Sequence, residues 1–173
     1  MKRTWLSGER WKLVQTSIPV VCVDVLPIHF SPNSDSDLQS VGLILRKTPE
    51  GRKWCLIGGR LLYGESLSEA IRRQVREALG RHVKVRVGPD QQPFYIAQYA
   101  PSGRTPFVLE RRQHSVGLTY ALEIHGTPTP RGEAIVFRWF ETAKLPRRTQ
   151  FGFSQDRVLR TCLRLLRNHC SQP

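Results

Sequence analysis

The stretch 58–81, GGRLLYGESLSEAIRRQVREALGR, carries the strongest structural signal in the sequence. Ser66 followed by Glu69 is the pattern of a capping box, in which each side chain accepts a hydrogen bond from the other residue's backbone N–H. Gly80 is the residue type that most often follows the last turn of a helix. Apolar residues recur at helical spacing at Leu67, Ala70, Ile71, Val75, Ala78 and Leu79. The stretch therefore predicts a helix that begins after Ser66, ends at Gly80 and buries one face.

The polar residues of this helix have a spacing that suits a metal and phosphate site. Positions 73, 74, 77 and 78 share one edge, because residues three or four apart are neighbours on a helix. Carboxylates on such an edge can hold Mg²⁺, which prefers oxygen ligands and bridges to substrate phosphates. Glu77 supplies one carboxylate, whereas Gln74 and Ala78 stand where two more would fit.

The stretch resembles the Nudix box, G-x5-E-x7-R-E-U-x-E-E-x-G-U, in which U is a bulky aliphatic residue. The matching residues are Gly59, Glu65, Arg73, Val75, Glu77 and Gly80, and the departures are Gln74, Ala78 and Arg81. The resemblance implies that Glu77 binds metal. It also implies that Glu65 pairs with Arg73 and braces the loop against the helix, and that Gly59 and Gly80 have structural roles.

A second match to the same family lies outside the box. Nudix proteins commonly carry a further metal ligand or base on a loop six residues before a tryptophan, and Glu133 precedes Trp139 by that interval. The resemblance thus implies that Glu133 supplements Glu77 in catalysis and in metal binding. In ordinary Nudix pyrophosphatases the positions of Gln74 and Ala78 are both glutamates. Gln74 offers a metal only a neutral carbonyl oxygen.

Beyond the box, the order IPVVCVDV, WCLIGGR, FYIAQY and FRWF is similar to the GDP-mannose mannosyl hydrolases, an atypical Nudix branch that cleaves a glycosidic C–O bond. This likeness covers approximately residues 6–140. It implies that Asp24, Arg46 and Arg60 bind substrate, with both arginines near the diphosphate, and that Gly58 offers its carbonyl to the metal. The catalytic histidine of that branch aligns with Ala134, so its mechanism does not transfer unchanged.

The remaining patterns predict the elements around the helix. Strand patterns cover 18–30, 41–45, 54–57, 83–87, 94–99, 115–124 and 134–140, and helix patterns cover 6–15 and 154–168. The turn formers at 31–37 predict a polar loop. Together with the resemblance, these patterns predict an α/β fold, a single-domain Nudix α/β/α sandwich with a mixed β-sheet. Its N-terminal helix lies within 1–17, its core spans 18–146, and a C-terminal amphipathic helix lies within 147–173.

The composition indicates the charge of the partner and the compartment of the protein. Lys and Arg outnumber Asp and Glu by 27 to 14, which gives a net charge of +13 and predicts an anionic partner. The basic residues are dispersed along the chain, which disfavours a dedicated DNA-binding patch. The four cysteines form no C-x-x-C pair and indicate a reducing compartment. Since neither a signal peptide nor a membrane span is visible, we expect a cytoplasmic protein.

Several side chains can be interpreted in two ways. Tyr95, Tyr99 and Trp139 suit either stacking on a nucleobase or packing in a core. His114 suits a base or an ordinary structural histidine. Asp24 lies in an apolar strand and requires a partner, which is either an arginine of the protein or the ligand.

The function that the resemblance implies is Mg²⁺-dependent hydrolysis, with Mn²⁺ as a substitute, of a nucleoside diphosphate linked to another moiety such as a sugar. Dimerisation follows by analogy with the branch. One alternative is a non-catalytic nucleotide-binding module, which Gln74 and Ala78 favour. The other is an RNA-end-processing or RNA-binding Nudix protein, which only the positive charge favours.

Overall fold

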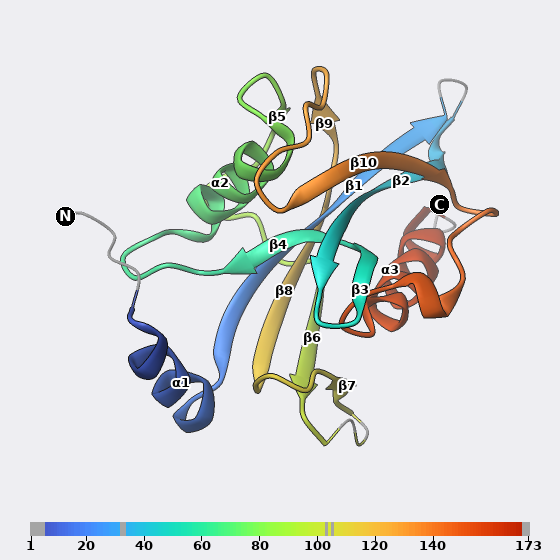
Figure 1. Ribbon diagram of the computed structural model, residues 1–173. Helices are drawn as coiled ribbons and strands as arrows, with labels where there is room; N and C mark the ends of the chain where they lie inside the picture. Colours follow the sequence, from blue (N-terminus) through green and yellow to red (C-terminus); the bar gives the residue numbers. More distant parts are fainter. Residues whose placement is uncertain (1–5, 32–33, 103, 105, 171–173) are drawn as a thin grey trace.

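A mixed β-sheet runs through the middle of the computed structural model, which describes residues 6–31, 34–102, 104 and 106–170 (Figure 1). Its strands are β1 (Val20–Ser31), β2 (Ser34–Thr48), β3 (Gly51–Cys55), β4 (Ile57–Arg60), β6 (Tyr95–Ala100), β7 (Val108–Leu109), β8 (Ser115–Leu122) and β10 (Ala134–Glu141). They follow the order β10-β2-β1-β8-β6-β7, with β3 paired to β2 and β4 paired to β1. A separate two-stranded sheet contains β5 (Lys84–Val85) and β9 (Ile124–His125).

Strand β1 is the centre of the large sheet because it pairs with three other strands. It runs parallel to β8 and antiparallel to β2 and β4. A central strand is covered on both faces, and the near-continuous apolar run VVCVDVL is typical of such a strand. The buried strand predicted over 18–30 is confirmed for residues 20–30, whereas Ile18 caps α1 and is 58% exposed.

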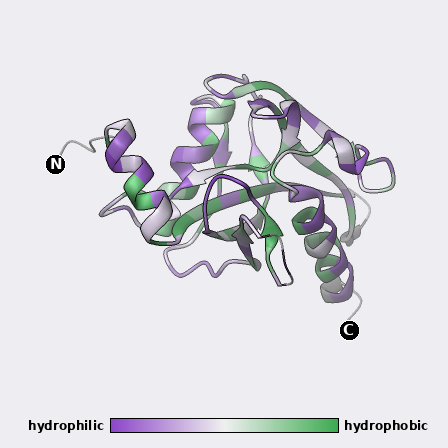
Figure 2. Cartoon of the chain, turned by 60° about the horizontal axis from the view of Figure 1, so that its bottom comes forward, coloured by the Kyte–Doolittle hydropathy of each residue, from purple (hydrophilic) through white to green (hydrophobic). Residues whose placement is uncertain are grey.

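Two helices cover opposite faces of the sheet and give it two cores (Figure 1). Because side chains alternate along a strand, Val23 and Val25 of β1 pack under helix α2 (Leu67–Leu79), whereas Leu26 and Ile28 pack under helix α3 (Gln155–Cys170). Hydrophobic and hydrophilic bands alternate along both helices (Figure 2). The predicted α/β/α sandwich with a mixed sheet is confirmed.

Helix α1 (Gly8–Ser17) lies outside these two layers, near the beginning of β1 (Figure 1). None of its residues is buried, and it begins and ends two residues later than the predicted helix over 6–15. Residues 1–5, which belong to the predicted N-terminal segment, lie outside the described residues, as do residues 171–173 at the C-terminus. Between β10 and α3 the chain forms a short 3₁₀ helix, Arg148–Gln150.

The predicted loop over 31–37 is wrong for residues 34–37. Strand β1 continues to Ser31 and β2 begins at Ser34, so the two strands form a hairpin with irregular register around Phe30. Backbone pairing between these strands overrides the preference of Ser and Asp for turns, because strand propensity depends strongly on context.

Two further expectations concern the environment of the protein. Among the described residues, no helix has the length and apolar character needed to cross a membrane. Cys22, Cys55 and Cys162 are free thiols, and burial raises the pKa of each to about 12. The raised pKa values favour the protonated thiol over the reactive thiolate at neutral pH.

Candidate active site

Capping residues determine where helix α2 begins and ends. These two ends fix the position of its polar edge. The Ser66 N–H donates to Glu69 Oε2 at 2.8 Å, and the Glu69 N–H donates to Ser66 Oγ at 3.3 Å. Gly80 follows the last turn with φ of +92°, a conformation that a side chain disfavours. Both predicted ends of the helix are confirmed.

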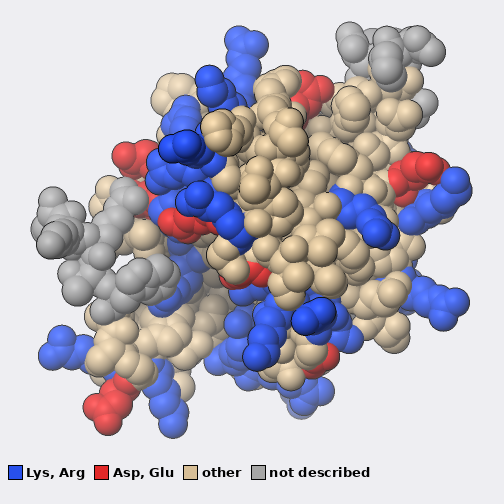
Figure 3. All heavy atoms as spheres, turned by 45° about the horizontal axis from the view of Figure 1, so that its top comes forward, with Lys and Arg blue, Asp and Glu red and all other residues tan. Residues whose placement is uncertain are grey.

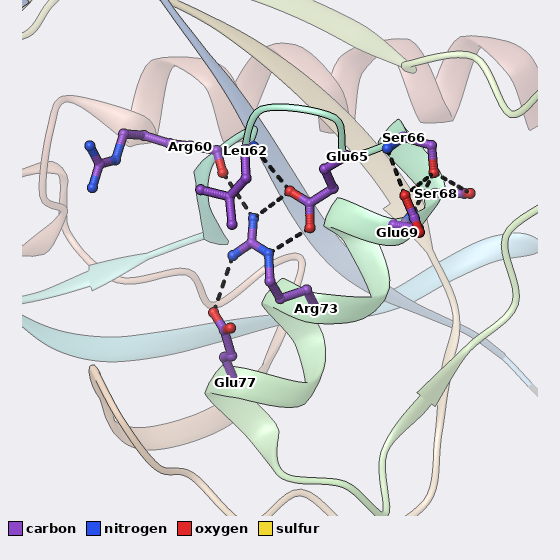
Figure 4. A network of polar contacts seen from close by, with 8 residues as sticks. All are labelled: Arg60, Leu62, Glu65, Ser66, Ser68, Glu69, Arg73 and Glu77. Atoms are coloured by element: carbon purple, nitrogen blue, oxygen red, sulfur yellow. Dashed lines mark hydrogen bonds and ion pairs between the residues drawn. The ribbon is translucent and has the colours of Figure 1, made fainter. Parts of the chain in front are cut away.

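Arg73 ties the helix to the preceding loop (Figure 4). Its Nε and Nη2 donate to the two carboxylate oxygens of Glu65 at 2.7 and 2.9 Å, and Nη2 also donates to the Arg60 carbonyl at 2.9 Å. Its Nη1 donates to Glu77 Oε2 at 3.2 Å. The Glu65 side chain is fully buried, so this bidentate pair is shielded from solvent. Glu65 and Arg73 are thus in the contact that the resemblance implied.

Gly58 and Gly59 allow strand β4 to approach β1 and α2 closely. Gly58 lies opposite Asp24 in the β1–β4 ladder, and a Cβ at Gly58 would overlap the Asp24 carboxylate and the Val23 carbonyl. A Cβ at Gly59 would lie 2.7 Å from the amide of Gln74. A side chain at Gly58 would therefore push β4 away from β1, whereas a side chain at Gly59 would displace the Gln74 amide.

The Gln74 amide is already engaged by the protein. In the orientation that satisfies both amide atoms, its oxygen accepts from the Gly59 N–H and from Arg73 Nη1, both at 3.2 Å. Gln74 is buried, with 7% of its surface exposed. These contacts compete with the metal-binding role predicted for Gln74, because the oxygen that would coordinate a cation serves two donors instead.

The loop before β10 docks on the end of α2 and brings Glu133 to the same region. The Arg131 N–H donates to the Ala78 carbonyl at 3.0 Å, and the Thr129 N–H donates to the Leu79 carbonyl at 2.8 Å. The last carbonyls of a helix lack partners within it, so the loop satisfies two of them. This docking places Glu133 near Glu77, although the two residues are far apart in the sequence.

Glu133 also pairs with the predicted substrate-binding residue Arg46 of β2. The Arg46 Nη2 to Glu133 Oε2 distance is 2.6 Å. Burial raises the pKa of Glu133, the charge of Arg46 opposes this shift, and the charge of Glu77 adds to it. The Arg46 Nε is buried and has no hydrogen-bond partner among the described residues.

These residues face one cavity of about 670 Å³. Its lining comprises Trp11, Gln15, Cys22, Arg46, Gly58, Gly59, Arg60, Arg73, Gln74, Glu77, Ala78, Arg112, Gln113, Arg131, Gly132 and Glu133. Five of these are arginines and two are glutamates, so the cavity carries an excess of positive charge that favours an anionic ligand.

A smaller pocket of about 80 Å³ adjoins the cavity and reaches Asp24, Tyr99 and Gln155. Burial raises the pKa of Asp24 to about 7, against the lowering effect of Arg46, and the charge of Glu133 raises it further. Asp24 is buried, with 6% of its surface exposed. The nearby charge of Arg46 thus partly compensates the buried carboxylate.

The other predicted site residues lie in different parts of the structure, some of them outside the cavity wall. The Arg60 guanidinium lies over the Trp11 ring, 3.7 Å from its centroid, and burial lowers the pKa of Arg60. His114 packs edge-on against Phe107 and is not part of the cavity wall. Tyr95 packs in the core under α3, and Trp139 of β10 contacts His29 of β1. None of the three aromatic residues proposed for base stacking lines the main cavity.

Several cavity residues were missed by the sequence analysis. Arg112 holds the buried carboxylate of Glu110 at 2.8 and 2.9 Å and lies over the Phe153 ring, 4.1 Å from its centroid. Phe153 has φ of +55°, which is unusual for a large side chain. The pair of adjacent arginines at 111–112 was visible in the sequence, but nothing local indicated that Arg112 reaches the cavity.

The oxygen donors of this site suit Mg²⁺. Glu77 and Glu133 are two carboxylates of one cavity wall, with side chains 56% and 41% exposed, and the charge of Glu77 raises the pKa of Glu133. A cation relieves such repulsion. No group of three or more His, Cys, Asp and Glu capable of holding a metal occurs in the described part of the chain. Mg²⁺ needs fewer protein ligands, since one or two carboxylates and substrate phosphates suffice.

Comparison with protein families gives a match over residues 1–166 to the family described as domain of unknown function DUF4916. Comparison with curated proteins found no match.

Among solved structures, a protein from Jonesia denitrificans described as a possible asymmetric diadenosine tetraphosphate hydrolase has a TM-score of 0.78 at 27% identity, covering 87% of this chain and 96% of that one. A MutT Nudix hydrolase from Burkholderia pseudomallei has a TM-score of 0.63 at 20% identity, with coverages of 86% and 98%. The Nudix domain of Shewanella oneidensis NrtR, solved with ADP ribose, has a TM-score of 0.58 at 15% identity, with coverages of 93% and 99%. The fold is that of the Nudix hydrolases.

Proposed function

The chain belongs to the family described as domain of unknown function DUF4916, and from its Nudix fold we propose that it is a Mg²⁺-dependent hydrolase. Its substrate would be a nucleoside diphosphate linked to another moiety, such as a sugar. The observation that carries the proposal is the presence of Glu77, Glu133 and Arg46 on the wall of one cavity that holds an excess of arginines.

The carboxylates would provide the metal site together with the Gly58 carbonyl. Mg²⁺, when bound, would neutralise charge on the phosphates and activate a water molecule. Glu133 is positioned by Arg46 and would orient that water by accepting its hydrogen bond, since its raised pKa makes it a better proton acceptor.

The arginines would bind the diphosphate. Arg46 lines the cavity with its side chain 21% exposed, so its guanidinium would meet a phosphate oxygen there. Arg60 presents a guanidinium plane held against Trp11. Arginines placed in this way stabilise the charge that develops on the diphosphate leaving group.

The names of the similar proteins support the same class of substrate. They include a possible diadenosine tetraphosphate hydrolase and a domain in complex with ADP ribose. Each of these compounds contains a nucleotide whose phosphate chain is linked to a second group.

The competing proposal is a non-catalytic nucleotide-binding module. It is favoured by the Gln74 amide, which is engaged by Gly59 and Arg73, and by Ala78, which supplies no ligand. An RNA-binding function has less support, because basic side chains lie in several separate groups on the face shown in Figure 3. The expected homodimer also stays a proposal, which light scattering of the purified protein would test.

A product analysis tests the function. The full-length protein would be incubated with nucleotide sugars, dinucleoside polyphosphates and 5′-triphosphorylated RNA, with Mg²⁺ and separately with Mn²⁺. From a nucleotide sugar, free sugar and nucleoside diphosphate would indicate attack at carbon, whereas nucleoside monophosphate and sugar phosphate would indicate attack at phosphorus. From a dinucleoside polyphosphate or the RNA, cleavage within the phosphate chain would indicate attack at phosphorus. Binding of these compounds without any product would contradict the hydrolase and support the module.

A further inference from the structure

One end of the main cavity is lined by residues to which the proposed metal and phosphate chemistry assigns no role, apart from Arg60. This end is lined by Trp11 and Gln15 of α1, by Arg60 of β4 and by Gln113 of the loop before β8. The Arg60 guanidinium lies 3.7 Å from the centroid of the Trp11 ring, and Gln15 Nε2 donates to Gln113 Oε1 at 2.8 Å. A flat stacked pair and two side-chain amides therefore form one wall.

Core packing does not account for this wall. Helix α1 buries none of its residues, and its Leu13 side chain is 67% exposed. Trp11 of this helix nevertheless lines the cavity. Trp11 and Gln15 lie four residues apart, so both occupy the same face of the helix. We therefore interpret this face as part of a binding site.

The chemistry of the wall matches a nucleobase. Aromatic rings and guanidinium planes both stack on bases, and such stacking tolerates every base because each has a π-face. The hydrogen bond between Gln15 and Gln113 uses one amide donor and one amide oxygen. Whichever amide donates, the pair retains a further N–H donor and a further carbonyl acceptor. Nucleobases present donors and acceptors on their edges, so the amides complement them.

We propose that the end of the cavity formed by Trp11, Gln15, Arg60 and Gln113 is a nucleobase subsite. The base stacks against the Trp11–Arg60 pair, and its edge bonds to the two amides. This inference rests on the proposed function, because it assigns the base of the same nucleotide whose phosphates lie toward Glu77 and Glu133. It makes α1 the element that distinguishes nucleotides from other diphosphates.

The experiment compares a ligand that has a base with one that lacks it. Dissociation constants of ADP and of inorganic pyrophosphate would be measured by calorimetry, with Mg²⁺, for the full-length wild type, Trp11→Ala and Leu13→Ala. Trp11→Ala should weaken ADP binding about tenfold, which is typical for loss of one base-stacking aromatic residue. It should leave pyrophosphate binding within about twofold, because Arg60 keeps its charge and donors. Leu13→Ala, a change at an exposed position of the same helix, should alter neither constant.

Other results would overturn the subsite. Equal weakening of ADP and pyrophosphate would show that Trp11 acts only by holding Arg60 in place. Unchanged ADP affinity in Trp11→Ala would show that the base binds elsewhere. Base-dependent binding without hydrolysis of any substrate would contradict the proposed function and would still support the subsite, so the two failures are distinguishable.

Discussion

Arg46 on strand β2 and Glu133 on the loop before β10 form an ion pair, with 2.6 Å between Nη2 and Oε2. The same loop donates two backbone hydrogen bonds to the last turn of α2, which carries Glu77. These contacts bring two carboxylates from distant parts of the sequence to one cavity wall. The proposed chemistry depends on this arrangement.

Replacing Glu133 by Gln should lower turnover by about 100-fold or more, because general acid–base groups contribute about 10²- to 10⁴-fold. The amide keeps the shape of the side chain but cannot accept a proton or carry negative charge. Glu141→Gln is the matched control, since Glu141 belongs to β10 and forms an exposed pair with Lys144. Steady-state rates of both variants check the prediction. Equal rates for Glu133→Gln and the wild type would remove Glu133 from the mechanism.

Replacing Glu65 by Gln should destabilise the fold by about 3 kcal/mol, because it leaves the buried charge of Arg73 without its bidentate partner. The free energy of unfolding from urea titration measures the effect. Glu141→Gln should cost less than about 1 kcal/mol, as expected for an exposed ion pair. Similar losses in the two variants would show that the Glu65–Arg73 contact is not a structural brace.

Replacing Ala78 by Glu should lower the Mg²⁺ concentration that gives half-maximal activity by roughly tenfold, because ligand charge tunes the affinity for hard cations. Ala78 lines the cavity and adjoins Glu77 in the helix. The control is Ala78→Gln, which adds similar volume without charge. If the folded Glu variant requires as much Mg²⁺ as the Gln variant, the site has diverged from a metal geometry that uses position 78.

The buried carboxylate of Asp24 should make the ligand-free protein less stable as pH rises. Its pKa is raised from 3.8 to about 7, so between these values the folded state binds more protons than the unfolded state. Stability therefore falls as pH increases from about 4 to about 7 and levels off above that. Asp24→Asn should remove this dependence and should be more stable than the wild type above pH 7, because the amide carries no charge to bury. Urea titrations at several pH values test this, and parallel profiles for both proteins would contradict it.

Local signals in the sequence predicted much of the fold and the helix that carries the site. Ser66 and Glu69 form a capping box although only three positions apart, and Gly80 ends the helix through its own backbone conformation. Both signals are local, so the sequence alone predicts the ends of the helix. The hairpin around 31–37 was mispredicted because pairing between β1 and β2 outweighs the turn preference of its polar residues.

The residues that line the cavity were harder to predict from the sequence. Trp11 was placed correctly on a helix, but its contact with Arg60 depends on how α1 lies beside the sheet. Arg112 reaches the cavity from a loop held by Glu110, and Gln74 turns toward Gly59 instead of toward solvent. These outcomes depend on contacts between distant segments, which neither periodicity nor a motif encodes.

Metal uptake tests the central claim most directly. Calorimetric titration of the full-length wild type with Mg²⁺ or Mn²⁺, beside a saturating nucleoside diphosphate compound, should show binding that Glu77→Gln weakens strongly while its fold remains intact. Absence of metal uptake by the wild type, or equal uptake by Glu77→Gln, would contradict the account.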